Sequence, residues 1–382
     1  MKILQTISGF GAHSGGTSTC TYDLISALHA EMGMVDLLTL SSKAPTDRLM
    51  GMGEEWIHAL PNDAITPFGY SANMKRWMEE KMGEYDILHA NGLWMYANHI
   101  TCAMARKYGK PYVITPHGML YPAALRRSYW KKWPFLKLFF HKDIMHASCL
   151  HATCKQEMEH IREFGYRGPV AIIPNPMVLP APPSAKRSPK AKKAFGFLGR
   201  LHPRKKVENL FYGVELLKER QQECELWIMG SGLSEYEAFL KAEVERLGLR
   251  NVRFLGFVSG QEKYEKLAQL STLFVPSDFE NFGMIVTEAL SVGTPVMASL
   301  GTPWEELNNQ HCGWWCDRTP ENIAQVMRQV LDMSAQELDA MGERGKAMAK
   351  ANFVAEEVAC KVMQLYSWLL DGGQAPAFVH EI

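Results

Sequence analysis

Short apolar runs alternate with stretches of helical periodicity along the whole chain, and this pattern predicts alternating strands and helices. In the first half we expect helices at 21–31 and 96–108 and strands at 2–7, 35–40, 86–89, 112–115 and, as the last strand, 170–173. In the second half we expect strands at 194–198, 225–229, 252–255, 273–275 and 295–298 and helices at 207–218, 235–247, 261–270 and 283–292. From 321 onward we expect helices, the last of them at 355–370. Such alternation produces parallel sheets that are covered on both faces.

A proline-rich segment separates the two series of elements. Residues 174–193 contain six prolines and five lysines or arginines, and proline restricts the backbone and removes hydrogen-bond donors. We therefore predict an extended linker with a solvated basic surface between two domains, 1–178 and 190–354. The predicted fold class is α/β, with two facing, doubly wound, Rossmann-like domains and a ligand cleft between the carboxyl ends of both sheets.

The composition fits this picture and excludes several other classes of protein. The chain has 382 residues, 47% of them hydrophobic, which suits two hydrophobic cores better than one. Basic and acidic residues number 41 each, so the formal net charge is zero, which argues against nucleic acid binding through bulk charge. The 10% aromatic content excludes a mainly disordered, collagen-like or coiled-coil chain.

The eight cysteines form only two close pairs, and neither pair has the two-residue spacing of zinc or redox motifs. The pairs are Cys149/Cys154 and Cys312/Cys316, with His151 and His311 nearby. We expect reduced thiols in a cytoplasmic protein and no metal site. Residues 1–10 lack the pattern of a signal peptide, and no window of about 20 apolar residues predicts a membrane span.

A glycine-rich loop, residues 9–17, follows the first expected strand. Glycines let the backbone approach a phosphate or an acceptor, and a helix N-terminus favours anions; a tight strand–helix turn is the equally weighted alternative. The glycine spacing departs from the dinucleotide fingerprint, and Ser41 and Ser42 stand where an acidic residue would bind ribose. Both departures argue against a nicotinamide enzyme.

Two further loops follow expected strands and carry ionisable side chains. His117 comes after the strand at 112–115, where a neutral imidazole either hydrogen-bonds a reacting group or is structural. Residues 199–206 form a basic loop, in which arginine offers a planar fork for phosphate oxygens and lysine a compact charge. This loop could neutralise a diphosphate without a metal. A solvated helix start is the disfavoured alternative, because cations oppose the helix dipole there.

Two glutamates lie on either side of a Phe-Gly pair in residues 280–288. Glu280 is placed to accept hydrogen bonds from hydroxyl groups, and helix-start amides near Gly283 could meet phosphate. Glu288 lies two turns into a largely apolar expected helix, where an unpaired carboxylate is costly to bury. A ribose diol would satisfy it, and so would a salt bridge with a neighbouring helix.

Taken in order, these motifs resemble those of glycosyltransferase family 4, retaining enzymes of the GT-B architecture. The most specific mark is the pair Glu280 and Glu288, seven residues apart, with Phe282-Gly283 between them. Supporting motifs are the strand end 199–201 with Lys205, the segment 173–176 and the segment 254–258. The resemblance covers nearly the whole chain.

The resemblance implies a role for each matching residue. His117 would contact the donor sugar and help the reaction at the anomeric carbon, while Arg200 and Lys205 would bind the donor diphosphate and stabilise its developing charge. Glu280 would hold sugar hydroxyls and Glu288 the ribose hydroxyls. The remaining implied donor contacts are Gly15 and Gly16 at the phosphates, Gly256, Phe257 and Val258 at the nucleobase, and the main chain of Phe282, Gly283 and Met284 at phosphate.

The resemblance also implies the division of labour between the domains. The N-terminal domain would bind the acceptor and receive the final helix, 355–375, and residues 190–354 would bind the donor. The family commonly has glycine after the lysine of the basic loop, where this chain has Lys206, and the spacing from Arg200 favours Lys205 as the phosphate ligand. The implied reaction moves a hexose from a nucleotide-diphosphate sugar, a co-substrate, to an acceptor hydroxyl, with no metal or other cofactor.

Residues 126–142 combine six lysines or arginines with five tryptophans or phenylalanines and contain no acidic residue. This combination suits an anionic membrane surface, the diphosphate of a polyprenyl-diphosphate-linked glycan acceptor, or an amphipathic helix whose aromatic side is core. With the resemblance, it implies bacterial surface polysaccharide synthesis (capsule, exopolysaccharide or lipopolysaccharide) by a cytoplasmic enzyme at the inner face of the plasma membrane. A sugar-nucleotide epimerase or phosphorylase of the same fold and a non-catalytic sugar-nucleotide-binding protein are the alternatives.

Overall fold

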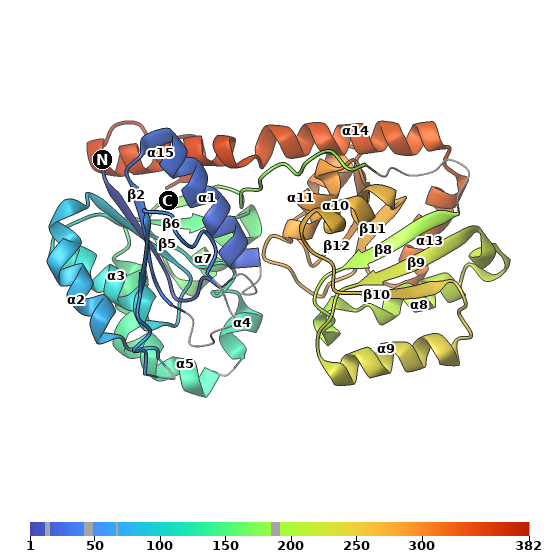
Figure 1. Cartoon of the computed structure of the whole chain (residues 1–382), viewed down its shortest axis with the longest axis horizontal. Coiled ribbons are helices and arrows are strands. Elements are labelled where there is room, and N and C mark those ends of the chain that lie inside the picture. The colour runs from blue at the N-terminus through green and yellow to red at the C-terminus, as the bar shows by residue number, and fades with distance from the viewer. Residues whose placement is uncertain (12–15, 42–48, 66–67, 128, 185–191, 382) are drawn as a thin grey trace. The chain divides into compact units, whose positions relative to one another are not determined.

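The computed structural model describes residues 1–11, 16–41, 49–65, 68–127, 129–184 and 192–381 (Figure 1). These residues form two compact units, one from Met1–Met177 with Ala355–Ile382 and one from Val178–Val354. The first unit therefore contains both ends of the chain, and the second is one continuous segment.

The described part of the first unit is a doubly wound sheet with helices on both faces. Its strands are β1 (Ile3–Ile7), β2 (Val35–Leu40), β3 (Ile57–Leu60), β4 (Ile87–Asn91), β5 (Tyr112–Thr115), β6 (Cys149–Ala152), β7 (Val170–Ile172) and β14 (Val379–His380). Its helices are α1 (Gly16–Met32), α2 (Ala72–Lys81), α3 (Tyr96–Lys107), α4 (Pro122–Arg126), α5 (Tyr129–Phe135), α6 (His141–Met145), α7 (Lys155–Phe164) and α15 (Ala355–Asp371). The strand order is β14-β7-β6-β5-β4-β1-β2-β3, and only β14 runs antiparallel to its neighbour.

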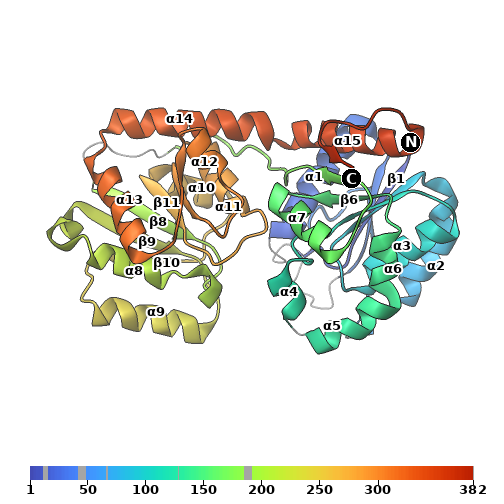
Figure 2. The same cartoon turned by 180° about the vertical axis from the view of Figure 1, so that it is seen from behind.

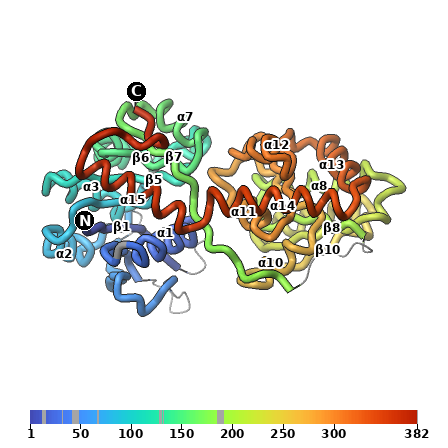
Figure 3. The backbone as a smooth tube through the Cα atoms, turned by 90° about the horizontal axis from the view of Figure 1, so that it is seen from above, coloured from blue at the N-terminus to red at the C-terminus, as the bar shows by residue number. Residues whose placement is uncertain are grey.

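Successive side chains of this sheet enter cores on opposite faces, as the two-residue period of a strand requires. Ile3 of β1 packs with α1 and α15, while the next residue, Leu4, packs with α2 and α3. Helix α15 lies beside α1 and buries Val358, Val362 and Leu365 completely, at the spacing of one helical face (Figure 3). The C-terminal helix is therefore part of the core of the first unit.

The second unit holds a six-stranded parallel sheet in the order β10-β9-β8-β11-β12-β13. The strands are β8 (Lys193–Leu198), β9 (Cys224–Met229), β10 (Val252–Gly256), β11 (Thr272–Val275), β12 (Val296–Ser299) and β13 (Gly313–Cys316). The helices are α8 (Glu208–Glu215), α9 (Ser234–Arg246), α10 (Gly260–Gln269), α11 (Met284–Ser291), α12 (Glu306–Asn309), α13 (Pro320–Asp332) and α14 (Ala335–Asn352). Helices α8, α9 and α13 pack on one face of this sheet, and α10, α11, α12 and α14 on the other (Figures 1 and 2).

The last strand expected in the first half of the chain and the last expected helix are confirmed, as β7 and α15. A strand that was not expected, β14, joins β7 from the C-terminal segment. Helix α15 ends at Asp371. Gly372 and Gly373 follow with positive φ angles of 72° and 95°, a conformation that favours glycine and stops a helix.

Candidate functional site

The sheet of the second unit changes its winding direction between β8 and β11. The chain winds outward from β8 through β9 and β10, and in the opposite direction from β11 through β12 and β13. Ligands of open α/β sheets bind beside the carboxyl ends of the strands at such a switch point. The loops that follow β8 and β11 carry the predicted Arg200, Lys205 and Glu280.

Lys205 and Glu280 form an ion pair between these two loops. The Lys205 Nζ donates to the Oε1 of Glu280, and the Ser277 hydroxyl donates to the same oxygen at 2.7 Å. The two side chains of the ion pair are only 25% and 15% exposed, so solvent screens the pair less than it would a surface pair. Among the described residues, the other carboxylate oxygen of Glu280 has no hydrogen-bond partner and can accept a hydroxyl.

Lys206 lies in a different environment from Lys205. Its backbone is left-handed, with φ 50°, at the end of the turn Pro203–Lys205. A side chain costs about 1 kcal/mol in that conformation, and glycine costs nothing. The Lys206 Nζ lies 3.9 Å from Asp278 and 4.0 Å from Glu208. Arg318 pairs with the other Asp278 oxygen at 3.0 Å.

Asp278 and Arg318 were not expected from the sequence, and neither were two glycines after β9. A Cβ on Gly230 would collide with the carbonyl oxygen of Gly199, and a Cβ on Gly232 with that of Leu201. These close approaches bring the loops after β8 and β9 together. The Gly-Ser-Gly triplet directly after an expected strand was the available signal.

The remaining predicted residues of this unit lie at the same edge of the sheet. Arg200 is exposed and has no ion-pair partner among the described residues. Gly256, which has no side chain, ends β10 with φ 73°. Phe257 is 66% exposed, and Val258 is buried. The carboxyl edge of the second sheet thus presents a free guanidinium beside exposed main chain.

Helix α11 begins beside the same edge. Gly283 caps it with φ 80°, and Met284 is its first residue. The Phe282 side chain is buried against Trp304 and Phe353, and the Trp304 indole N–H donates to the Phe282 carbonyl at 2.5 Å. The Phe282 ring therefore holds the loop in place and leaves the main chain to face a ligand.

Glu288 is paired with a neighbouring helix, which is one of the two alternatives that the sequence left open. The Lys263 Nζ of α10 donates to Glu288 Oε1 at 2.7 Å. Burial raises the pKa of Glu288 above its ordinary value, and the charge of Lys263 opposes that rise. In the part of the chain that the structure describes, its second oxygen has no partner, so the ion pair does not preclude a ribose contact.

In the first unit, the switch point lies between β1 and β4. The predicted Gly15 lies outside the described residues, and Gly16 is exposed at the first position of α1. His117 follows β5, the strand next to β4, and has a left-handed backbone with φ 51°.

The His117 imidazole is neutral at physiological pH. Burial, with a smaller contribution from His151, lowers the pKa of His117 to about 3. Its Nε2 is buried and has no hydrogen-bond partner among the described residues. A buried polar atom without a partner is unusual in a native protein and marks a position that a ligand can satisfy.

Two family models match consecutive parts of the chain. Residues 15–176 match the glycosyl transferase 4-like domain, and residues 183–348 match glycosyl transferases group 1. The chain is 27% identical to glycogen synthase of Mycobacterium tuberculosis over 314 residues, covering 79% of this chain and 73% of that one. It is 24% identical to the D-rhamnosyltransferase WbpZ of Pseudomonas aeruginosa over 331 residues, covering 84% and 83%.

The fold agrees with these matches. The crystal structure of HepE from Anabaena in complex with UDP and glucose superposes with a TM-score of 0.74 at 18% identity, covering 96% of this chain and 99% of that one. This chain is a GT-B glycosyltransferase. The predicted α/β fold class and the predicted transferase activity are thereby confirmed.

In this glycosyltransferase, most of the basic and aromatic segment 126–142 belongs to one uninterrupted helical run, residues 129–145. The run consists of α5, the π-helical turn Leu136–Phe140 and α6, and α4 ends before it, where Arg127 has an extended backbone. Phe140 is fully buried, and Phe135 and Phe139 stack on Phe68, so part of the aromatic set is core. The exposed apolar side chains are Trp130 at 88%, Leu138 at 69% and Trp133 at 45%.

The described helices of the glycosyltransferase include none with the length and apolar character needed to span a bilayer. All eight cysteines are free thiols. Both ring nitrogens of His151, near one cysteine pair, form hydrogen bonds, one to Thr115 and one to the Ile173 carbonyl.

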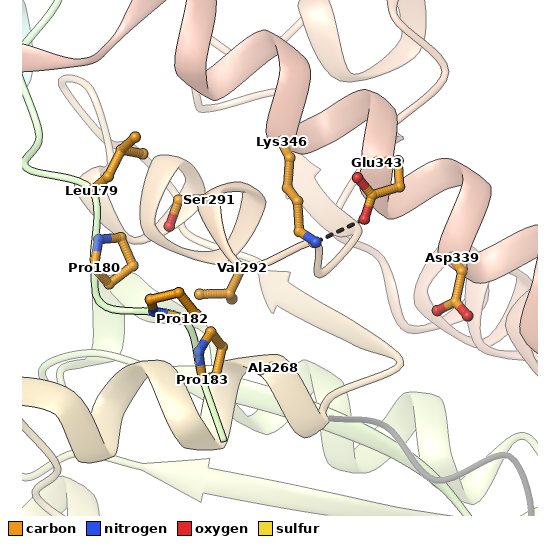
Figure 4. Close-up of a pocket in the computed structure, with 11 residues that line it drawn as sticks. Leu179, Pro180, Pro182, Pro183, Ala268, Ser291, Val292, Asp339, Glu343 and Lys346 are labelled. Carbon is orange, nitrogen blue, oxygen red and sulfur yellow. Dashed lines mark hydrogen bonds and ion pairs between the residues drawn. The ribbon is translucent and has the colours of Figure 1, made fainter. Parts of the chain in front are cut away.

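A cavity of about 470 Å³ in the second unit lies apart from all of these residues (Figure 4). Prolines 180, 182 and 183 line one side, the end of α11 another, and Asp339, Glu343 and Lys346 of α14 a third. The Lys346 Nζ is paired with Glu343 at 2.7 Å. None of the predicted donor residues that the structure describes lines this cavity, so the candidate site is the sheet edge and not the cavity.

Proposed function

We propose that the glycosyltransferase moves a hexose from a nucleotide-diphosphate sugar to an acceptor hydroxyl with retention of configuration. The observation that carries the proposal is the cluster at the β8–β11 switch point, where the unpaired Arg200 and the Lys205–Glu280 pair occupy the position at which this fold binds ligands. The UDP and glucose named for the HepE structure support the same class of donor.

The chemistry follows from where charge develops. As the glycosidic bond to the leaving diphosphate lengthens, negative charge builds on its oxygens, and preorganised cations stabilise that charge more than they stabilise the bound substrate. Arg200 can bind the diphosphate without first breaking an ion pair, because its guanidinium is unpaired among the described residues. Lys205 would turn from Glu280 to the diphosphate and free the carboxylate for sugar hydroxyls. No metal and no second carboxylate nucleophile are invoked.

His117 would act at the donor sugar as a neutral hydrogen-bonding group. Its unpartnered Nε2 supplies one donor or one acceptor according to the tautomer, and its low pKa keeps it uncharged. Glu288 would receive the ribose hydroxyls on its unpaired oxygen, and the main chain of Gly256, Phe257 and Val258 would meet the nucleobase.

The test is a screen for release of UDP, GDP or ADP from a panel of sugar donors, with and without a lipid-linked glycan extract. We expect release of the nucleotide diphosphate to depend on the acceptor. We also expect NMR to show that the anomeric configuration of the product linkage, axial or equatorial, matches that of the donor. Arg200→Ala and Lys205→Ala should each lower kcat about 100-fold, since one lost charge-stabilising donor costs roughly 3 kcal/mol in the transition state. If both variants fold and retain near-normal rates, Arg200 and Lys205 do not stabilise the diphosphate.

The acceptor side of the proposal rests on the segment 126–142. We propose that this segment docks on the anionic inner face of the bacterial plasma membrane and receives a polyprenyl-diphosphate-linked glycan acceptor, in capsule, exopolysaccharide or lipopolysaccharide synthesis. Trp130, Trp133 and Leu138 are exposed beside lysines. Apolar side chains of this kind insert into a membrane interface, and lysines are attracted to anionic lipids.

Flotation with vesicles that contain 0 or about 30% anionic lipid checks the docking. We expect binding to the anionic vesicles alone, and about a tenfold loss in the triple variant Trp130→Ala/Trp133→Ala/Leu138→Ala. Phe239→Ala, in which a 42% exposed phenylalanine of the second unit is removed, is the matched control. Equal binding to neutral vesicles, or no loss in the triple variant, would contradict the docking.

A further inference from the structure

A continuous chain of buried hydrogen bonds crosses the carboxyl edge of the first sheet. Tyr366 of α15 contacts His89 Nδ1 at 2.6 Å, and His89 Nε2 contacts the Thr115 hydroxyl at 2.6 Å. The Thr115 hydroxyl contacts His151 Nδ1 at 2.8 Å, and His151 Nε2 contacts the Ile173 carbonyl at 2.8 Å. The four side chains are at most 3% exposed.

The chemistry of the last acceptor fixes the direction of every bond in this chain. A carbonyl oxygen only accepts, so the His151 Nε2 carries a proton and donates to Ile173. Burial lowers the pKa of His151 to about 4, so the ring is neutral and its Nδ1 is an acceptor for the Thr115 hydroxyl. Thr115 must then accept from His89 Nε2, whose neutral ring accepts at Nδ1 from Tyr366.

The direction of the hydrogen bonds at the Tyr366 end of this chain of hydrogen bonds is fixed as well. The Gln5 side-chain amide donates to the Tyr366 hydroxyl at 3.0 Å, and the Asn91 amide donates to the Gln5 oxygen at 2.9 Å. Each hydrogen bond from Asn91 to Ile173 therefore has an assigned donor and an assigned acceptor. Fully satisfied buried networks of this kind make their surroundings rigid, and a single missing member leaves costly unpaired groups.

The chain of hydrogen bonds reaches the candidate site at Thr115. Thr115 is the last residue of β5, and His117 follows two residues later in its left-handed conformation. On the other side of His117, the Gly118 amide donates to Glu157 Oε1 at 2.5 Å, and the second Glu157 oxygen accepts from Thr153. His117 is thus held between two buried attachments while its own Nε2 has no partner among the described residues.

We propose that Thr115, His89, His151 and Tyr366 are positioning residues for glycosyl transfer, which act by fixing the strand end that places the His117 imidazole. The proposal rests on the role of His117 in the proposed function. It gives helix α15 a part in the reaction, because the Tyr366 hydroxyl supplies the proton that begins the chain.

The test compares Thr115→Val with Thr115→Ser. Valine keeps the branched shape and loses the hydroxyl that serves both histidines, whereas serine keeps the hydroxyl. We expect Thr115→Val to lower kcat at least tenfold with the donor KM within twofold of wild type, since only transition-state alignment suffers. Thr115→Ser should retain at least half of kcat, and Tyr366→Phe should behave like Thr115→Val.

Tyr166→Phe is the matched control for these variants. Tyr166 is as buried as Tyr366 and lies in the same unit, but its hydroxyl donates to the Ala147 carbonyl, outside the chain. We expect it to lower the melting temperature about as much as Tyr366→Phe and to leave kcat within twofold. If folded Thr115→Val keeps normal kcat, or if Tyr166→Phe loses as much kcat as Thr115→Val, the positioning role is wrong.

A spectroscopic measurement keeps the proposal testable if the variants fail to fold. In long-range ¹H–¹⁵N spectra of the wild type at neutral pH, His89 and His151 should both be neutral with the proton on Nε2, and both protons should exchange slowly. A proton on Nδ1 of either ring would overturn the assigned chain. A failure of the proposed function looks different, because His117→Ala would then keep normal turnover or no donor would be consumed.

Discussion

At the scale of single residues, backbone conformation and charge partners distinguish neighbours that the sequence presents as equivalent. Lys205 and Lys206 are adjacent, yet one pairs with Glu280 at the switch point and the other lies in a left-handed turn beside Asp278. Spacing alone favoured Lys205 as the diphosphate ligand. The ion pair with Glu280 supports that choice, because both residues of the pair belong to the proposed donor site.

We predict that Lys206→Gly keeps kcat within about threefold of wild type, in contrast to the loss expected for Lys205→Ala. Relief of the left-handed backbone, about 1 kcal/mol, offsets two weak ion pairs and the added entropy of the unfolded chain. The free energy of unfolding should therefore change by no more than about 1 kcal/mol, as measured by urea titration. A large loss of turnover in Lys206→Gly alone would transfer the diphosphate role to Lys206.

At the scale of elements, apolar runs predicted strands regardless of their length, and elements without such a run were missed. Strands β2 and β5 have the predicted bounds, whereas β3, β6 and β13 were not expected, and neither were helices α2 and α7. His151 within β6 makes that strand look polar, because the sequence does not reveal that Thr115 and a carbonyl satisfy the imidazole.

The candidate site shows the same division between local and long-range information. Motifs indicated Arg200, Lys205 and Glu280, since each stands directly after an expected strand. They did not indicate Arg318, which reaches Asp278 from 40 residues further along the chain. Contacts of that length depend on strand order, and the order is set by packing that no local pattern records.

Helix α15 provides the prediction at this scale. Leu365→Ala should destabilise the first unit by about 3 kcal/mol, since its fully buried side chain leaves a cavity. The exposed neighbour Gln364→Ala should cost less than about 0.5 kcal/mol. Hydrogen–deuterium exchange should show faster exchange in peptides from β1 and β4 in Leu365→Ala and no change in peptides from β8 and β9. Equal effects of the two substitutions would mean that α15 is not part of this core.

At the scale of the whole molecule, three neutral histidines make stability depend on pH. Burial holds the pKa of His89 well below its ordinary value, that of His117 at about 3 and that of His151 at about 4. In the unfolded chain these groups titrate near 6.5. Between those values the unfolded state binds more protons than the folded state, so the free energy of unfolding falls as the pH falls.

We therefore predict that acid destabilises the first unit in a window from about pH 6.5 down to about pH 4, with a slope of about 1 kcal/mol per pH unit for each histidine. Thermal unfolding at intervals across that window measures the slope. His151→Gln, which retains a hydrogen-bonding side chain without titrating, should lower the slope by about one third. A stability that is constant over this window would contradict the assigned protonation states.

Because the first unit is made from two separate segments, Met1–Met177 and Ala355–Ile382, its folding order during translation is constrained. Residues 178–354 leave the ribosome as one uninterrupted stretch that holds its whole sheet, so this stretch can fold before synthesis finishes. The first 177 residues must wait for α15 and β14, with the apolar surface that α15 covers open to chaperones or to aggregation. A nonsense mutation after residue 354, even though it would spare every residue of the proposed donor site, would leave residues 1–177 unable to complete their core.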